Sequence, residues 1–157
     1  GETMGLVQTG EIGLLRTGAP CRVSIGGAES NVAIAAARLG APAAWCGRVG
    51  PDALGDLVER TLRAEGVAAV VARDTAPTGL MVRHERFAGD VHVDYHRAAS
   101  AGSRIRPADI PDELLAGAGV VHLTGITPAL GTAARETVLD VLDRAERLGV
   151  PVCFDVN

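Results

Sequence analysis

The sequence predicts an α/β fold in which helices cover a parallel sheet. Short apolar runs of strand length alternate with segments of helical periodicity along most of the chain. A different texture begins at Thr78, because two β-like segments flank a short turn there. The 157 residues, 47% of them hydrophobic and 22% charged, suffice for a globular core.

The first half of the chain contains two expected helices, each followed by an expected strand. The stretch from Asn31 to Leu39 has no helix breaker and ends at Gly40, a residue suited to a helix C-cap. The segment from Ala53 to Glu65 carries leucine and valine at helical spacing and stops at Gly66. The expected strands are 43–49 and 67–72.

The segments 79–86 and 91–97 predict an antiparallel hairpin around the turn 87–90. In the second segment Val91, Val93 and Tyr95 alternate with polar residues, so we expect one covered face and one wetter face. We place this hairpin outside the main sheet.

The last third of the chain predicts a strand at 119–123, a long amphipathic helix at 132–148 and a strand at 150–155. Strands that alternate with helices are joined by crossovers and therefore run parallel. This order is the main support for an α/β sheet covered by helices.

The residue counts exclude several functions. The formal net charge of −4 argues against nucleic-acid binding through a basic face. All fifteen basic residues are arginine, so the chain has no lysine for a Walker-type phosphate loop, a Schiff base or a general base. The three cysteines form no CxxC pair, which predicts neither a zinc site nor a disulfide framework. Cys46 and Cys153 lie in apolar runs and are expected to be buried.

No apolar run reaches the length of a membrane span, and no charged segment followed by an apolar run marks a secretory signal. We therefore expect a cytoplasmic protein with no membrane partner and no nucleic-acid partner.

Ligands of open α/β sheets bind beyond the carboxyl ends of the strands. The loop 24–31 contains paired glycines and opens into a helix, which favours the approach of a ligand to backbone N–H groups. A simple turn with Ser30 or Asn31 as the helix N-cap explains the same loop equally well.

Two further loops follow expected strands. For the loop 47–55 we favour a structural role, with Asp52 capping the next helix. In the loop 123–131 either Thr127 or Thr132 caps a helix, or the small residues form the floor of a ligand site.

The hairpin supplies the charged candidates. Tyr95 and Arg97 lie two residues apart on one strand face, where an arginine beside a tyrosine suits a carboxylate or polyhydroxy ligand. The alternative is a solvated arginine at a sheet edge with Tyr95 packed on its stem. The four histidines show no HExxH or triad spacing, so we give none a catalytic role.

Three segments carry a family resemblance. The residues 26–33, 36–40 and 47–55 resemble the first signature of ribokinase-like (PfkB) carbohydrate kinases. Glu29 departs from the general signature, which prefers a small residue there, but such loops are familiar in the 2-keto-3-deoxygluconate kinase branch. The residues 98–103, 123–130 and 154–157 are also similar to that branch.

The resemblance implies a ribokinase-like, Rossmann-type three-layer sandwich with a small β-sheet lid, truncated before its ATP-binding half. Residues 1–157 would be the N-terminal, sugar-binding portion, with lid strands at approximately 12–25 and 78–98.

The resemblance also implies a sugar site. Gly27 and Asn31 would contact sugar hydroxyls, and Arg97 would bind the carboxylate or keto end of a sugar acid. Met81 stands where relatives place an aromatic residue in the first lid strand. The implied substrate-binding residues are Gly26, Gly27, Asn31, Tyr95, Arg97, Ile126 and Asn157.

The implied activity is transfer of the ATP γ-phosphoryl group to a hydroxyl of 2-keto-3-deoxygluconate or a similar sugar acid, with Mg²⁺ as cofactor. The GAGD-type motif with the catalytic base has no match in this chain, so we expect the base beyond residue 157 and expect the chain alone to be inactive. For the same reason ATP and Mg²⁺ are not expected to bind fully to these residues, and no metal ligand is assigned among them.

Two alternatives stay open. The protein could act on another sugar, such as fructose, ribose or a nucleoside. It could also be a non-catalytic sugar-binding or dimerisation fragment that forms a homodimer through its lid strands.

Overall fold

The computed structural model describes residues 1–157 and contains eight strands. The strands are β1 (Met4–Ile12), β2 (Cys21–Gly26), β3 (Ala44–Val49), β4 (Ala68–Arg73), β5 (Leu80–Glu85), β6 (Val91–His96), β7 (Val121–Thr124) and β8 (Val152–Asp155). The α-helices are α1 (Ala28–Arg38), α2 (Ala53–Ala64), α3 (Asp112–Ala116), α4 (Ile126–Ala129) and α5 (Thr132–Leu148), and two short 3-10 helices are η1 (Gly102–Arg104) and η2 (Pro107–Asp109).

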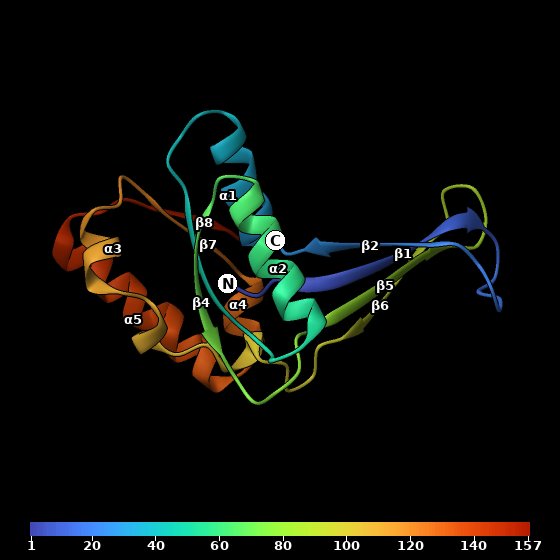
Figure 1. Ribbon diagram of the computed structural model, residues 1–157. Helices are drawn as coiled ribbons and strands as arrows, with labels where there is room; N and C mark the ends of the chain where they lie inside the picture. Colours follow the sequence, from blue (N-terminus) through green and yellow to red (C-terminus); the bar gives the residue numbers. More distant parts are fainter.

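The strands form a parallel pair β3–β4, a parallel pair β7–β8 and a separate four-stranded sheet in the order β2-β1-β5-β6. Helices α1 and α2 lie on one side of β4, β7 and β8, and α3 and α5 lie on the other (Figure 1). This layering confirms the predicted α/β class.

The four-stranded sheet projects away from the helices (Figure 1). Its β5 and β6 pair antiparallel from Leu80 with His96 to Glu85 with Val91, as expected for the hairpin. Strand β1 runs parallel to β5 and antiparallel to β2. We call this sheet the lid sheet.

The lid sheet begins earlier than the expected range 12–25, because β1 already starts at Met4 and β2 occupies Cys21–Gly26. Gly5 and Gly10 interrupt the apolar pattern of β1, and glycine weakens a strand signal in a sequence. At Gly5 strand β1 lies close to α2, since a Cβ there would lie 2.7 Å from a methyl group of Leu54.

Two apolar clusters fill the layers. Trp45 and Val49 of β3 pack with Val58 and Leu62 of α2, and all four are at most 2% exposed. On the other side Cys46 packs against a cluster that includes Val141 of α5. Successive residues of a strand point to opposite faces, so β3 serves both clusters.

Two expectations about burial are wrong. Cys153 is exposed, because β8 pairs only with β7 and all four of its residues are exposed. Val91 and Tyr95 are 43% and 57% exposed, because β6 is an edge strand and α2 packs beneath β1 and β2 instead. The expectation for Cys46 agrees better with the structure. Cys46 is half-buried, and this burial raises the pKa of its thiol.

The helices end where the sequence predicts. Gly40 and Gly66 follow α1 and α2 with φ values of 86° and 79°, a left-handed conformation that glycine adopts without strain. None of the helices combines the length and the apolar character that crossing a membrane requires.

Candidate functional site

The glycine pair Gly26–Gly27 joins the end of β2 to the start of α1. A Cβ on Gly27 would lie 2.5 Å from the carbonyl oxygen of Glu2, and a Cβ on Gly26 would lie 2.5 Å from Cε of Met81. Two segments far apart in the chain therefore approach this turn closely, and at Gly27 the backbone contact leaves no room for a larger residue.

The N-cap of α1 is Gly27, so the alternative in which Ser30 or Asn31 caps this helix is wrong. The Ser30 hydroxyl donates to the Gly27 carbonyl at 3.1 Å instead of accepting from a helix N–H. No side-chain group therefore caps the first N–H groups of α1.

Asn31 lies one turn further along α1 and is exposed. It lines a groove of about 860 Å³ between α1, α2 and β2. Neither Tyr95 nor Arg97 belongs to the lining of this groove.

Tyr95 lies directly opposite Met81, which in turn lies beside Leu6 of β1. Paired residues of neighbouring strands share a face, so Tyr95, Met81 and Leu6 form a row across the lid sheet. On β2 the row continues to Ser24, which pairs with Leu6, and the end of the Met81 side chain approaches Gly26.

Arg97 follows β6 and is only 22% exposed at its side chain. Its Nη2 forms an ion pair with Oε2 of Glu2, whose side chain is 1% exposed. Its guanidinium carbon also lies 5.8 Å from the centre of the Tyr95 ring, a cation–π contact that puts both side chains on one face. The alternative of a solvated edge arginine is therefore wrong.

The turn after Arg97 brings a second group onto the same carboxylate. The backbone N–H of Ser100 donates to the Arg97 carbonyl at 3.1 Å, and Ala99 within this turn has a φ of 55°. The Ser100 hydroxyl donates to Oε1 of Glu2. Sequence reasoning missed Glu2; the only signal was a carboxylate at the start of an apolar strand.

Ile126 begins α4 and is half-buried. Its N–H donates to Oγ1 of Thr124 at 3.3 Å, and Thr124 donates in turn to Oε1 of Glu29 at 2.9 Å. Thr127 donates to the same Glu29 oxygen at 2.5 Å rather than capping a helix, and Gly131 takes the N-cap position that Thr132 was expected to fill.

Glu29 therefore ties the start of α1 to the β7–α4 loop from a position that is 7% exposed. Burial alone would raise the pKa of its carboxyl group. The hydrogen bonds that Thr127 and Thr124 donate to this carboxylate act in the opposite direction and lower its pKa.

Asn157 is exposed and donates its backbone N–H to Oδ1 of Asp155 at 3.0 Å. The residue before it approaches the Ile126 loop, because a Cβ on Gly125 would lie 2.4 Å from the Val156 carbonyl oxygen. Around residues 2–3 the structure thus gathers the Gly26–Gly27 turn and Arg97, and Glu29 connects this region to the loop of Ile126.

Comparison with known proteins decides the family. The model of the "pfkB family carbohydrate kinase" family matches residues 12–157. The chain belongs to the pfkB family of carbohydrate kinases.

Relatives of this pfkB-family chain agree with that assignment. The chain is 35% identical over 160 residues to the 2-dehydro-3-deoxygluconokinase of Bacillus subtilis (strain 168), and the match covers 100% of this chain and 49% of the relative. The crystal structure of the Thermotoga maritima 2-dehydro-3-deoxygluconokinase superposes with a TM-score of 0.91 at 32% identity, covering 100% of this chain and 49% of that one.

A fructokinase from Xylella fastidiosa, crystallised with bound ATP, superposes with a TM-score of 0.88 at 25% identity, covering 100% of this chain and 50% of that one. The pfkB-family chain thus spans about half the length of the relatives it matches.

In this pfkB-family chain the loop 47–55 has the structural role that we favoured from the sequence. Asp52 caps α2 by accepting from the N–H of Gly55 at 2.8 Å, and it also accepts from the N–H of Thr78 at 2.8 Å. Burial alone would raise the pKa of Asp52, but the N–H groups of Thr78 and Gly55 outweigh it and lower the pKa.

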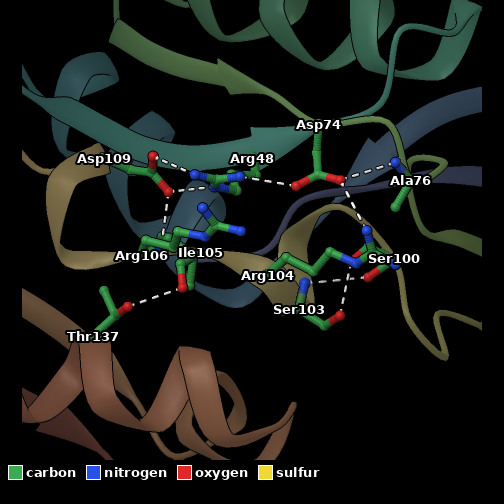
Figure 2. A network of polar contacts seen from close by, with 10 residues as sticks. All are labelled: Arg48, Asp74, Ala76, Ser100, Ser103, Arg104, Ile105, Arg106, Asp109 and Thr137. Atoms are coloured by element: carbon green, nitrogen blue, oxygen red, sulfur yellow. Dashed lines mark hydrogen bonds and ion pairs between the residues drawn. The ribbon is translucent and has the colours of Figure 1, made fainter.

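Arg48 near the end of β3 is the centre of a polar network (Figure 2). It donates to both carboxylate oxygens of Asp109, at 2.5 and 2.9 Å, and to Oδ2 of Asp74 at 2.8 Å. Asp74 also pairs with Arg104 at 3.3 Å. Asp109 and Arg104 belong to the segment that follows the turn after Arg97. The network holds this segment against the ends of β3 and β4, and so supports the position of Arg97.

Proposed function

We propose that this protein is a sugar kinase that transfers the γ-phosphoryl group of ATP to a hydroxyl of 2-keto-3-deoxygluconate or a similar sugar acid. The observation that carries the proposal is the guanidinium of Arg97, held at the base of the lid sheet beside Tyr95. The similarity of the whole chain to a 2-dehydro-3-deoxygluconokinase supports the same substrate class.

The proposed roles follow from the chemistry of each group. Arg97 binds the carboxylate or keto end of the sugar through charge-assisted hydrogen bonds, with Tyr95 beside it. The Gly26–Gly27 turn and the uncapped start of α1 offer N–H groups to sugar oxygens. The remaining proposed contacts are Asn31, Ile126 as part of the pocket wall, and Asn157.

The catalytic base is proposed to lie beyond residue 157. No three His, Cys, Asp or Glu side chains among residues 1–157 come together so as to hold a metal ion. We assign residues 1–157 the binding and orientation of the sugar but no step of phosphoryl transfer. We expect residues 1–157, incubated with Mg-ATP and 2-keto-3-deoxygluconate, to form no phosphorylated sugar, and product formation at a kinase-like rate would refute this.

Calorimetry tests the substrate class. The chain should bind 2-keto-3-deoxygluconate more tightly than ribose or fructose. Arg97→Ala should weaken binding of the sugar acid by roughly tenfold to a hundredfold, because a hydrogen bond between charged groups is lost. Arg86→Ala removes an exposed arginine without an ion pair in the same hairpin and serves as the matched control. Equal binding of all three sugars, or no effect of Arg97→Ala, would favour another sugar of the family.

The edges of the lid sheet favour a second proposal, that two copies of the chain pair through it. Strands β2 and β6 are unpaired edges, and Val23 and Val91 on them are 55% and 43% exposed. Exposed apolar edge strands readily pair with another chain. Light scattering should report a dimer that Val23→Lys dissociates, and a monomeric wild type would exclude this pairing.

A further inference from the structure

Glu2 is a buried charge with few partners. Its side chain is 1% exposed, and its two oxygens are reached by Arg97 and Ser100. A buried carboxylate is costly unless charged and hydrogen-bonding groups compensate it. Both compensating groups come from one short turn at the end of the lid sheet.

The backbone around Glu2 is shaped to hold it. A Cβ on Gly102 would lie 2.4 Å from Cγ of Glu2, and a Cβ on Gly79 would lie 3.0 Å from its Oε1. These two glycines bracket the lid hairpin in the sequence, so the carboxylate is enclosed from both ends of that hairpin. An enclosed carboxylate has little freedom and fixes the group that pairs with it.

Arg97 keeps donors that the protein does not use. Glu2 is reached by Nη2, whereas the buried Nε has no hydrogen-bond partner. A guanidinium carries five N–H donors in a rigid plane, so fixing one edge orients the others. An unpartnered buried donor next to a partly exposed guanidinium is an arrangement that a ligand oxygen would complete.

We propose that Glu2 is a positioning residue that orients Arg97 for the carboxylate of an acidic sugar. This inference rests on the proposed function and adds a specificity determinant to it. Glu2 acts through Arg97 and does not touch the sugar. It neutralises the guanidinium in the empty site and holds it in one orientation, so less side-chain freedom is lost when the sugar acid binds.

A double-mutant cycle tests this coupling. Glu2→Gln keeps the size and the acceptor for Ser100 but removes the charge. It should weaken 2-keto-3-deoxygluconate binding about tenfold, a coupling typical of residues in contact. In an Arg97→Ala background the same change should have no further effect. Glu113→Gln, at an exposed glutamate without an ion pair, is the matched control and should leave binding unchanged.

Ser100→Ala is the second variant, for the case that Glu2→Gln does not fold. It removes only the hydroxyl that donates to Glu2 and should weaken binding in the same direction by a few-fold. Tighter binding in Glu2→Gln, or the same loss with and without Arg97, would overturn the proposal.

A sugar-independent measurement separates this inference from the proposed function. The ¹⁵N-detected Nε–H signal of Arg97, identified by its absence in Arg97→Lys, should exchange with solvent at least tenfold faster in Glu2→Gln. Failure of the wild type to bind the sugar acid would refute the proposed function, while this exchange rate would still decide whether Glu2 orders Arg97. Unchanged exchange would overturn the positioning role.

Discussion

Arg48 joins β3 to η2 through a two-pronged contact with Asp109, in which Nε lies 2.5 Å from one carboxylate oxygen and Nη2 lies 2.9 Å from the other. The side chains of Arg48 and Asp109 are 12% and 8% exposed, and Asp74 on the other side of Arg48 is also 8% exposed. Arg48 therefore compensates two largely buried carboxylates, and Arg104 adds a second contact to Asp74.

Replacement of Arg48 should be clearly destabilising. Arg48→Met keeps much of the side-chain volume but leaves Asp74 and Asp109 without their shared partner. We expect a loss of about 2 kcal/mol in the free energy of unfolding, somewhat below the cost for a fully buried pair. Urea unfolding measures it. Arg38→Met breaks the exposed two-pronged contact with Glu65, at 2.6 Å for each prong, and should change stability far less. Equal losses in both variants would contradict this interpretation of the network.

Gly27→Ala should destabilise the start of α1. The added Cβ would meet the Glu2 carbonyl at 2.5 Å, and a backbone atom cannot move aside cheaply. A loss of about 1–3 kcal/mol is expected from such overpacking. Gly119→Ala is the control, because nothing lies within 4 Å of its added Cβ and its φ is not positive. Thermal unfolding of the two variants should differ clearly, and equal melting temperatures would show that the Gly27 approach is looser than described.

Thr127→Val should weaken the link between α1 and the β7–α4 loop. Thr127 is 3% exposed, and its hydroxyl donates to the buried Glu29 carboxylate. Valine has the same shape without the donor, so we expect a loss of about 1–2 kcal/mol. Thr17→Val, at an exposed threonine, should change the free energy of unfolding little. A Thr127→Val variant as stable as wild type in urea would show that Thr124 alone satisfies Glu29.

The Asp52 cap should make stability pH-dependent. Its pKa is lowered in the folded protein, so the ionised carboxylate stabilises the fold above its ordinary value of about 3.9, and this stabilisation disappears as the pH falls through the lowered pKa. Asp52→Asn should cost about 1 kcal/mol near pH 7, because one acceptor oxygen is lost. Urea unfolding at neutral and acidic pH should show this difference shrinking on acidification. A difference that stays constant across the range would rule out the proposed pH dependence.

Local patterns predicted most of the elements. The expected helix 132–148 coincides with α5, and the expected Asp52 cap starts α2. The expected hairpin contains β5 and β6. In each case the signal lies within a few neighbouring residues, as helical spacing, a capping side chain or a turn. Strand β1 was not predicted because Gly5 and Gly10 interrupt its apolar pattern, and its partners β2 and β5 lie elsewhere in the chain.

In the candidate site, too, some features could be predicted from the sequence and others are visible only in the structure. The sequence by itself determined the glycine pair, the position of Tyr95 two residues before Arg97, and the family resemblance, because spacing along the chain carries all three. Only the tertiary structure decided what these residues contact. Glu2 and Ser100 are separated by 98 positions, and so are Glu29 and Thr127. A buried carboxylate depends on whichever donors folding brings to it, and no local pattern in the sequence records which ones they are.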